Sequence, residues 1–244
     1  MDINYIRSSS HGTWALCENQ YFLSYVLGIS QRPNAKAEKG TVFHKVMECL
    51  ANCKKCEQDG IDSFTDDALG ELSRKEMWDD KFIRRITDKS FDYYTKKSPN
   101  TFTETDRTDI HKWVKKTLLF KDGMFDPRKR DIVGAEVHFD FEIEDDWGVL
   151  SDGSRLRIKG TIDLITRINH NIYENIDWKT GGRKNWASDD NIDKDYAYFQ
   201  RDFQLRTYHY ADFKMFPEVP QFVPTIYYVN AGGPFSIPLE KKDI

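Results

Sequence analysis

Three strand-like segments follow one another between residues 132 and 178, and this run constrains the fold more than any other feature of the sequence. Apolar and polar side chains alternate over residues 133–144 and again over residues 156–168, as in strands that bury one face. The sequence Asn-His-Asn at 169–171 is typical of a tight hairpin and leads into a third segment at 172–178. Connections this short join antiparallel neighbours, so we predict a small sheet at the centre of the fold.

Helical patterns lie on both sides of this predicted sheet. The serines at 8–10 can cap a helix over residues 8–30, and an apolar stripe predicts a second helix over residues 39–55. After the strands, a helix is predicted at about 196–216 and a further strand at 222–229. This order of elements predicts an α/β fold in which helices flank a small central mixed sheet.

Residues 57–125 differ in character from the rest of the chain. They are mostly polar, and turn sequences rich in Gly, Pro and Asp divide them. Three helices are predicted here, at residues 68–78, 81–96 and 106–120. We therefore interpret 57–125 as a helical insertion or subdomain in a core made of residues 1–56 and 126–244.

The overall composition narrows the class of protein. Aromatic residues make up 14% of the chain, which indicates a packed core because disordered chains are poor in Phe, Tyr and Trp. The formal net charge of -4 speaks mildly against a nucleic-acid-binding protein, whose surface is usually basic. A local groove can still be basic when metal-binding carboxylates lower the sum, so the net charge alone does not decide.

No sequence feature indicates secretion or a membrane. The first fifteen residues contain no apolar stretch of the kind found in secretory signals, and no run of about 18 apolar residues occurs in the chain. The four cysteines do not suggest a secreted disulfide scaffold in a chain of this length. We therefore expect no membrane attachment and a reducing, cytoplasmic setting.

Two aspartates occupy strand positions where that residue type is rare. Asp163 lies in Gly-Thr-Ile-Asp-Leu among apolar neighbours. Asp177 and Lys179 lie two residues apart, so a strand would direct both side chains to the same face. The hairpin can bring Asp163 beside them, and a buried pair of acids is costly unless a metal ion neutralises it. Lys179 could then stabilise an attacking hydroxide or the charge of a phosphate.

Two helices add polar residues to this set. His44 and Glu48 lie on the side of their predicted helix opposite its apolar stripe, where they are free to face a cleft. Gln204 and Tyr208 lie one turn apart on the helix predicted after the strands. Phosphodiester hydrolysis needs a hard divalent cation, oxygen ligands and a positioned water, and these residues offer a matching set.

Each of these residues also has an ordinary structural interpretation. The two acids and Lys179 could form ion pairs on a solvated sheet face, and His44 could be a hydrogen-bonded surface residue. Gln204 and Tyr208 could be helix packing positions with polar tips. Single residues do not separate these interpretations, whereas motifs in a fixed order do.

Four short motifs, taken in their order along the chain, resemble the RecB-type branch of the PD-(D/E)XK nucleases. They are Gly40-x-x-x-His44, Gly-Thr-Ile-Asp163-Leu, Asp177-Trp-Lys179-Thr-Gly and Gln204-x-x-x-Tyr208. Residues 8–28, around Cys17, are also similar to the opening helix of that branch. The resemblance covers the N-terminal helices and the chain from about residue 133, but not residues 57–125.

The resemblance implies a restriction-endonuclease-like core and a site for Mg²⁺ or Mn²⁺. The metal ligands would be His44, Asp163, Asp177 and the main-chain carbonyl of Trp178. Lys179 would be the catalytic lysine, and Gln204 and Tyr208 would orient it or contact the DNA backbone. Glu136 matches a recurrent acidic position to which we assign no role.

The function implied by the resemblance is metal-dependent hydrolysis of DNA by an exonuclease that acts on duplex ends or single strands. Recombination, repair and phage DNA metabolism are the expected settings, in the cytoplasm of a bacterial or phage-infected cell. The partners would be DNA and a helicase, a recombinase or another replication or repair protein. Two alternatives stay open: a non-catalytic nucleic-acid-binding module on a nuclease fold, and a structure-specific endonuclease.

The cysteines bear on a second cofactor. Some members of the family carry an iron–sulfur cluster on one N-terminal and three C-terminal cysteines. Cys17 matches the first position, but no cysteine follows Cys56, so we do not expect that cluster on this chain. Cys49, Cys53 and Cys56 lie on or near one helical face and could bind zinc or a cluster together with Cys17, although apolar packing explains their spacing better.

Overall fold

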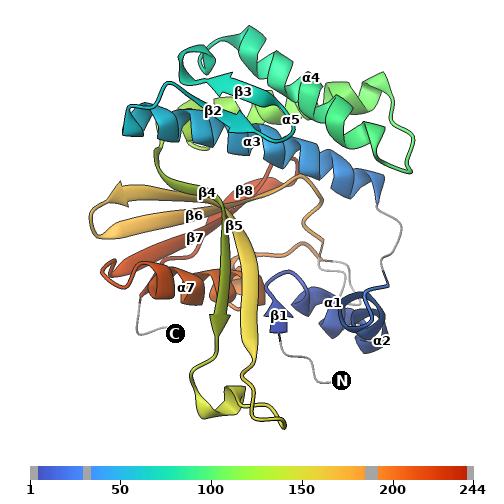
Figure 1. Ribbon diagram of the computed structural model, residues 1–244, viewed down its shortest axis with the longest axis vertical. Coiled ribbons are helices and arrows are strands. Elements are labelled where there is room, and N and C mark those ends of the chain that lie inside the picture. Colours follow the sequence, from blue (N-terminus) through green and yellow to red (C-terminus); the bar gives the residue numbers. More distant parts are fainter. Residues whose placement is uncertain (1–4, 30–33, 185–191, 241–244) are drawn as a thin grey trace.

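A mixed sheet lies at the centre of the computed structural model, and helices cover both of its faces (Figure 1). The structure describes residues 5–29, 34–184 and 192–240. The middle of the sheet consists of β5 (Arg157–Asn169), β6 (Ile172–Lys179) and β7 (Gln221–Tyr228). Because β5 and β6 run antiparallel whereas β6 and β7 run parallel, the predicted α/β architecture with a mixed sheet is confirmed.

Further strands extend the sheet at its edges. β4 (Asp131–Glu142) pairs antiparallel with one edge of β5, and β1 (Tyr5–Arg7) pairs parallel with the beginning of the other edge. β8 (Gly232–Ser236) and β9 (Leu239–Glu240) pair with the outer edge of β7. The four strands β4 to β7 match the strands predicted from sequence. β1, β8 and β9 were not predicted, because segments this short carry too few alternating positions.

One edge of β5 is shared between two strands. β1 pairs with residues 157–159 and β6 pairs from Leu164 onward, so residues 160–163 pair with neither of them along this edge. Gly160 suits this crowded point, because a Cβ atom there would come within 2.4 Å of the Phe139 ring and 2.6 Å of the Ser8 hydroxyl. The sheet therefore opens into a fork beside residues 160–163.

The long helix α3 (Ala35–Asp59) lies across one face of the sheet (Figure 1). The Asn34 side chain caps its start, and Gly60 ends it in a left-handed conformation with φ 72°. These two caps make the helix longer at both ends than the predicted 39–55. Its apolar stripe packs against the sheet, and the core cluster includes Cys49 and Cys53 among the fully buried residues.

Residues 57–125 form a layer on the outer side of α3 (Figure 1). Helices α4 (Asp80–Lys96) and α5 (Glu104–Leu119) confirm two of the three helices predicted here. Their buried side chains, such as Phe82 and Ile110, belong to the same core cluster as the apolar stripe of α3. The layer therefore stabilises α3 from the side that faces away from the sheet.

The helix predicted over residues 68–78 is wrong. The chain forms a hairpin of β2 (Ser63–Asp66) and β3 (Gly70–Ser73), followed by a 3₁₀ turn η2 (Arg74–Glu76). Asp66 Oδ1 accepts hydrogen bonds from the main-chain N of Ala68 and Leu69, each at 2.9 Å, and Gly70 has φ 78°. These turn contacts satisfy the backbone locally and bend the chain where a helix would have to continue.

The single helix predicted over residues 8–30 is also wrong. The described part contains α1 (His11–Leu16), α2 (Glu18–Tyr21) and a π-helical turn η1 (Phe22–Val26). The break is at Cys17, whose φ of -161° and ψ of 108° are extended. Residue 30, at the end of the prediction, lies outside the described residues.

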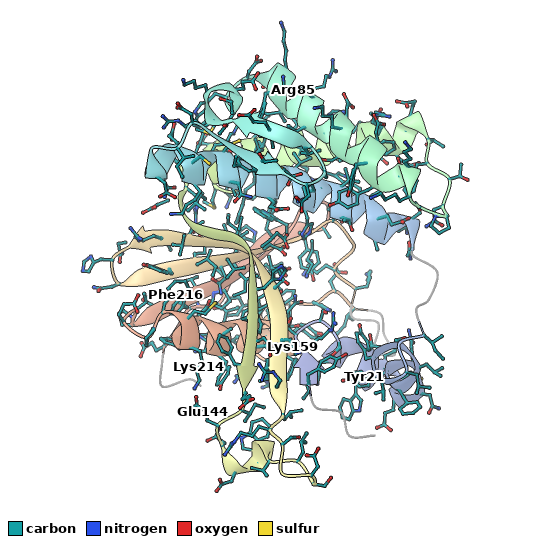
Figure 2. All side chains as sticks on the ribbon, in the orientation of Figure 1. Tyr21, Arg85, Glu144, Lys159, Lys214 and Phe216 are labelled. Carbon is teal, nitrogen blue, oxygen red and sulfur yellow. The ribbon has the colours of Figure 1, made fainter. Side chains whose placement is uncertain are left out.

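The other face of the sheet is covered by α7 (Phe203–Met215), which a short helix α6 (Tyr196–Phe199) precedes. The predicted helix 196–216 is thus divided, because the Asp202 side chain accepts from Leu205 N and begins a new helix. Lys214 of α7 pairs with Glu144, beyond the end of β4, at 2.9 Å (Figure 2).

Shorter turns are η3 (Phe120–Gly123), η4 (Pro127–Lys129) and η5 (Asp146–Gly148). Among the described helices, none combines the length and the apolar character needed to cross a membrane.

Candidate metal centre and active site

Two buried aspartates mark the fork where β5 and β6 diverge. Leu164 pairs with Ile176, so one further step of the ladder would place Asp163 opposite Asp177. Instead, Asp163 Oδ2 accepts a hydrogen bond from the Trp178 main-chain N at 2.9 Å. Asp163 and Asp177 are only 9% and 2% exposed, so two carboxylates lie close together where little water reaches them.

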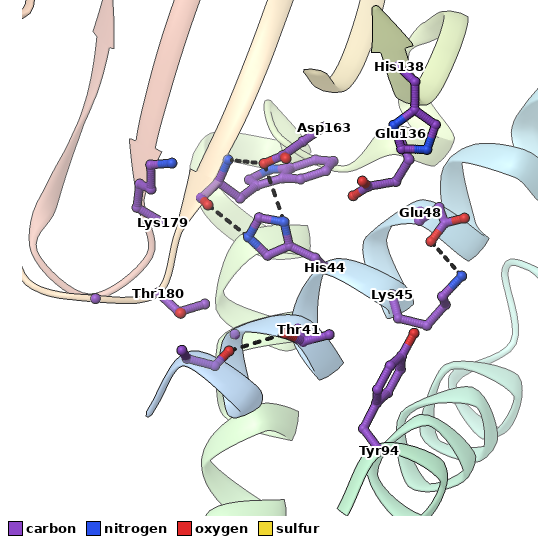
Figure 3. Close-up of a pocket in the computed structure, with 14 residues that line it drawn as sticks. Thr41, His44, Lys45, Glu48, Tyr94, Glu136, His138, Asp163, Lys179 and Thr180 are labelled. Atoms are coloured by element: carbon purple, nitrogen blue, oxygen red, sulfur yellow. Dashed lines mark hydrogen bonds and ion pairs between the residues drawn. The ribbon is translucent and has the colours of Figure 1, made fainter. Parts of the chain in front are cut away.

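His44 reaches this fork from α3 (Figure 3). Its Nδ1 lies 3.4 Å from Asp163 Oδ2, and its Nε2 donates to the Trp178 carbonyl oxygen at 2.9 Å. The approach depends on Gly40, one turn earlier, because a Cβ atom there would lie 3.0 Å from Thr180 Oγ1. The motif Gly40-x-x-x-His44 thus describes a helix that must come close to the end of β6 to deliver its histidine.

Glu136 joins the same cluster from β4. The pairs Ala135–Leu164 and Val137–Ile162 flank it and place it across from Asp163. Its φ is 47°, a left-handed conformation that is uncommon for a residue with a side chain and typical of functional sites. His44, Glu136 and Asp163 each offer a ligand atom, and these atoms all lie within 4.8 Å of one another.

Lys179 and Asp177 form a second group on β6, supported by α7. Lys179 Nζ lies 2.7 Å from Asp177 Oδ2 and 3.4 Å from Gln204 Oε1. Gln204 Nε2 donates to Asp177 Oδ1 at 3.1 Å and to the Tyr208 hydroxyl at 2.6 Å. The Tyr208 hydroxyl in turn donates to Asp177 Oδ1 at 3.3 Å. These contacts hold the Lys179 ammonium group beside Asp177, near the point where β5 and β6 diverge.

The family profile of the PD-(D/E)XK nuclease superfamily matches residues 8–233. The chain belongs to the PD-(D/E)XK nuclease superfamily. The match runs from the first serines to the beginning of β8 and includes the layer formed by residues 57–125. A comparison with curated proteins gives no match.

The charges of this candidate site oppose one another. Burial would lower the pKa of His44, but the Asp163 carboxylate outweighs burial and raises it to about 9. Burial, together with the charge of Asp163, raises the pKa of Glu136 to about 7. Burial also raises the pKa of Asp177, although the Lys179 ammonium acts in the opposite direction. Acidic groups are thus crowded together, and bound protons and Lys179 offset part of their repulsion.

The residues present fit a divalent cation. Two carboxylates and one imidazole within 4.8 Å are oxygen and nitrogen donors of the kind that Mg²⁺ and Mn²⁺ accept, and no thiol takes part. Opposite ligands on a small cation held at about 2.1 Å lie at most about 4.2 Å apart, so only a small contraction of the cluster is needed. A cation there would also offset the repulsion between Glu136 and the two aspartates.

The structure distributes the predicted site residues over two adjoining groups. His44 and Asp163 lie in the described cluster of ligand atoms, and the Trp178 carbonyl contacts His44. Asp177 lies outside that cluster and contacts Lys179, Gln204 and Tyr208. The metal-binding role of Asp177 and of the Trp178 carbonyl therefore stays a prediction, as do the catalytic roles of the other residues.

A cleft of about 600 Å³ opens onto these groups and contains residues that were not singled out from the sequence. Tyr94 of α4 lines it, so the layer formed by residues 57–125 contributes to the site (Figure 3). His138 also lines it, and its Nδ1 lies 2.7 Å from Thr161 Oγ1. His138 follows Glu136 by two residues, the spacing that returns to the same face of a strand, and this signal could have identified it.

Proposed function

We propose that this chain is a Mg²⁺- or Mn²⁺-dependent DNA nuclease of the RecB-type branch and that it acts as an exonuclease on DNA ends. The observation that carries the proposal is the convergence of His44, Glu136 and Asp163 from three separate elements, beside Lys179. Ion pairs that only stabilise a fold do not require three potential metal ligands to meet in the lining of a cleft. Membership of the nuclease superfamily supports phosphodiester hydrolysis as the reaction.

The metal would be held by His44, Asp163, Asp177 and the Trp178 carbonyl, with Glu136 as an additional ligand. A divalent cation bound there would stabilise negative charge on the phosphate and lower the pKa of a water molecule. Lys179 keeps its proton, because neighbouring Asp177 and Asp163 raise its pKa despite burial. Its ammonium group would hold a phosphate oxygen or the attacking hydroxide in place.

Gln204 and Tyr208 would act as positioning residues. Gln204 contacts both Lys179 and Asp177, and Tyr208 contacts Gln204 and Asp177. Since α7 carries both residues one turn apart, the helix would keep the lysine in a single orientation while substrate binds. Their loss would reduce the rate without removing the metal.

The biological setting follows from the family resemblance. We propose recombination, repair or phage DNA metabolism, with DNA as substrate and a helicase or recombinase as partner. Exonuclease action on DNA ends is taken from the same resemblance.

The decisive experiment is digestion of end-labelled linear, nicked and covalently closed circular DNA with Mn²⁺ or Mg²⁺. We expect loss of linear DNA from its ends, and no cleavage by Asp163→Asn or Lys179→Ala. Lys112→Ala, at an exposed position on α5, is the matched control and should cleave like the wild type. Cleavage of the circular form at the same rate would indicate an endonuclease. If no DNA is cleaved, the non-catalytic alternative holds.

A further inference from the structure

A second cavity, of about 580 Å³, adjoins the site through Gln204. Ser9, His11, Lys194, Tyr198, Arg201 and Phe203 are among the residues that line it. Gln204 lines this cavity and also contacts Lys179, which lines the first cleft. The contact between Gln204 and Lys179 therefore joins the linings of the two cavities beside the proposed catalytic lysine.

Aromatic rings lead from the N-terminal helices into this second cavity. The His11 ring stacks on Phe203, with ring centroids 4.4 Å apart and planes inclined by 16°. The Trp14 ring lies 5.9 Å from His11. Trp14 is 49% exposed, and α1, which carries it, buries none of its residues. The indole is thus available for a ligand and is not needed for packing in the described structure.

The charge of the cavity is positive although the chain as a whole is acidic. Arg201 is exposed and forms no ion pair with the described residues, and Lys194 lies 4.7 Å from the centre of the Tyr198 ring. The acidic residue in the lining, Asp202, is engaged as the cap of α7. A guanidinium that forms no ion pair with the described residues, close to the half-buried rings of His11 and Phe203 and the exposed Trp14, matches a ligand that carries both phosphates and flat bases.

We propose that Trp14, His11, Phe203 and Arg201, here called the Trp14 track, bind a single strand of DNA and lead it to the cleft. The proposal rests on the proposed nuclease function and specifies its substrate. Base stacking on Trp14 and His11 requires bases whose faces are free, a condition that a single strand meets and a paired duplex does not. A protein partner could also pack on the aromatic rings, but it would give no role to Arg201 or to the contact between Gln204 and Lys179.

Binding of a short fluorescent oligothymidylate, measured in EDTA by anisotropy, tests the track without cleavage. Trp14→Ala should weaken binding about tenfold, the loss of one stacked base, and Trp14→Phe should keep most of the affinity. Arg201→Ala should weaken binding and reduce the salt slope by about one. Trp147→Ala is the matched control, because Trp147 is 67% exposed on η5, away from both cavities, and should bind like the wild type.

The same variants tested in Mn²⁺ separate this inference from the proposed function. Trp14→Ala should raise KM for single strands with little change in kcat, because it removes binding and not chemistry. If wild-type protein cleaves DNA but Trp14→Ala leaves single-strand affinity unchanged, the track is wrong and the nuclease function stands. If Trp14→Ala weakens binding but wild-type protein cleaves nothing, the nuclease function is wrong and the track stands. Equal losses on blunt duplex, or a change only in self-association by sedimentation, would also overturn the track.

Discussion

Glu136 combines two features that oppose stability. Its backbone is left-handed, which is unfavourable for a residue with a Cβ atom, and its carboxylate is partly buried across from Asp163. Glycine at this position would avoid the backbone strain, and an apolar side chain would avoid the cost of burying a carboxylate. The combination is understandable if the carboxylate serves a ligand, because binding then compensates for a loss in folding stability.

Replacing Glu136 with Gly should therefore stabilise the metal-free protein and weaken metal binding. Relief of about 1–3 kcal/mol of strain, less about 0.5–1 kcal/mol for the flexibility of glycine, gives a net gain of about 1 kcal/mol in unfolding free energy. Urea denaturation in EDTA measures this gain. Calorimetry with Mn²⁺ should show an affinity loss of about tenfold or more. Glu136→Gln keeps the strained backbone, so equal urea midpoints for the two variants would contradict stored strain.

The cysteines give a prediction about solvent access. Burial raises the pKa of Cys53 to about 12 and raises that of Cys49 still further, whereas Cys17 is exposed. Because the thiolate is the reactive form, a disulfide reagent should modify about one thiol per chain in the native protein and four after unfolding. Cys17→Ser should show none before unfolding. Rapid modification of two or more thiols in the native protein would contradict the packing interpretation of Cys49, Cys53 and Cys56.

At the scale of elements, the approach of α3 to β6 determines where His44 lies. Gly40 permits this approach, and the Thr180 side chain is the group that a larger residue would meet. Gly40→Ala should raise the intrinsic helix stability by about 1 kcal/mol while pushing α3 away from the fork. Misplacement of His44 by a few tenths of an ångström should reduce cleavage by about tenfold to a hundredfold.

A double variant tests this geometric reason. Thr180→Ala removes the Oγ1 atom that the new Cβ would meet at 3.0 Å, so it should restore most of the activity that Gly40→Ala loses. The measurement is single-turnover cleavage at saturating Mn²⁺ for the two single variants and the double variant. Additive losses in the double variant would show that Gly40 acts through something other than this contact.

The elements also explain which features could be predicted from the sequence. The strands between residues 131 and 179 show clear alternation of apolar and polar residues and are joined by tight turns, so the local sequence was enough to predict them. The hairpin at β2 and β3 was mistaken for a helix because its turn depends on the Asp66 side chain and on φ at Gly70. The kink at Cys17 likewise has no signature in the apolar pattern.

The candidate site likewise contains residues that could be identified from the sequence and residues that could not. Asp163, Asp177 and Lys179 were identified because polar residues in apolar strands are rare and because their motifs resemble those of the family, and the structure places them in two adjoining groups. Glu136 and Tyr94 were not assigned a role, because their approach depends on a backbone irregularity and on the packing of α4 against α3. Such contacts are set by tertiary structure and leave little trace in local periodicity.

At the scale of the whole molecule, the site lies where separate layers meet. His44 comes from the helix above the sheet, Gln204 comes from the helix below it, and the acids come from the strands between (Figure 1). The proposed ligands come from α3 and the strands, so metal binding should link α3 to the sheet and stabilise the fold. This linkage gives a prediction that does not depend on which DNA is the substrate.

Adding Mn²⁺ at about 100 times its Kd should raise the free energy of unfolding by about 2.7 kcal/mol, because the ion binds the folded state alone. For a chain of 244 residues this corresponds to an increase in Tm of about 5–10 °C by differential scanning fluorimetry.

Lys179→Ala should keep this increase while losing cleavage, because it removes the chemistry and leaves the ligands. Asp163→Asn should lose both. An increase that persists in Asp163→Asn would place the ion elsewhere, and a missing increase in Lys179→Ala would make that lysine part of the metal site.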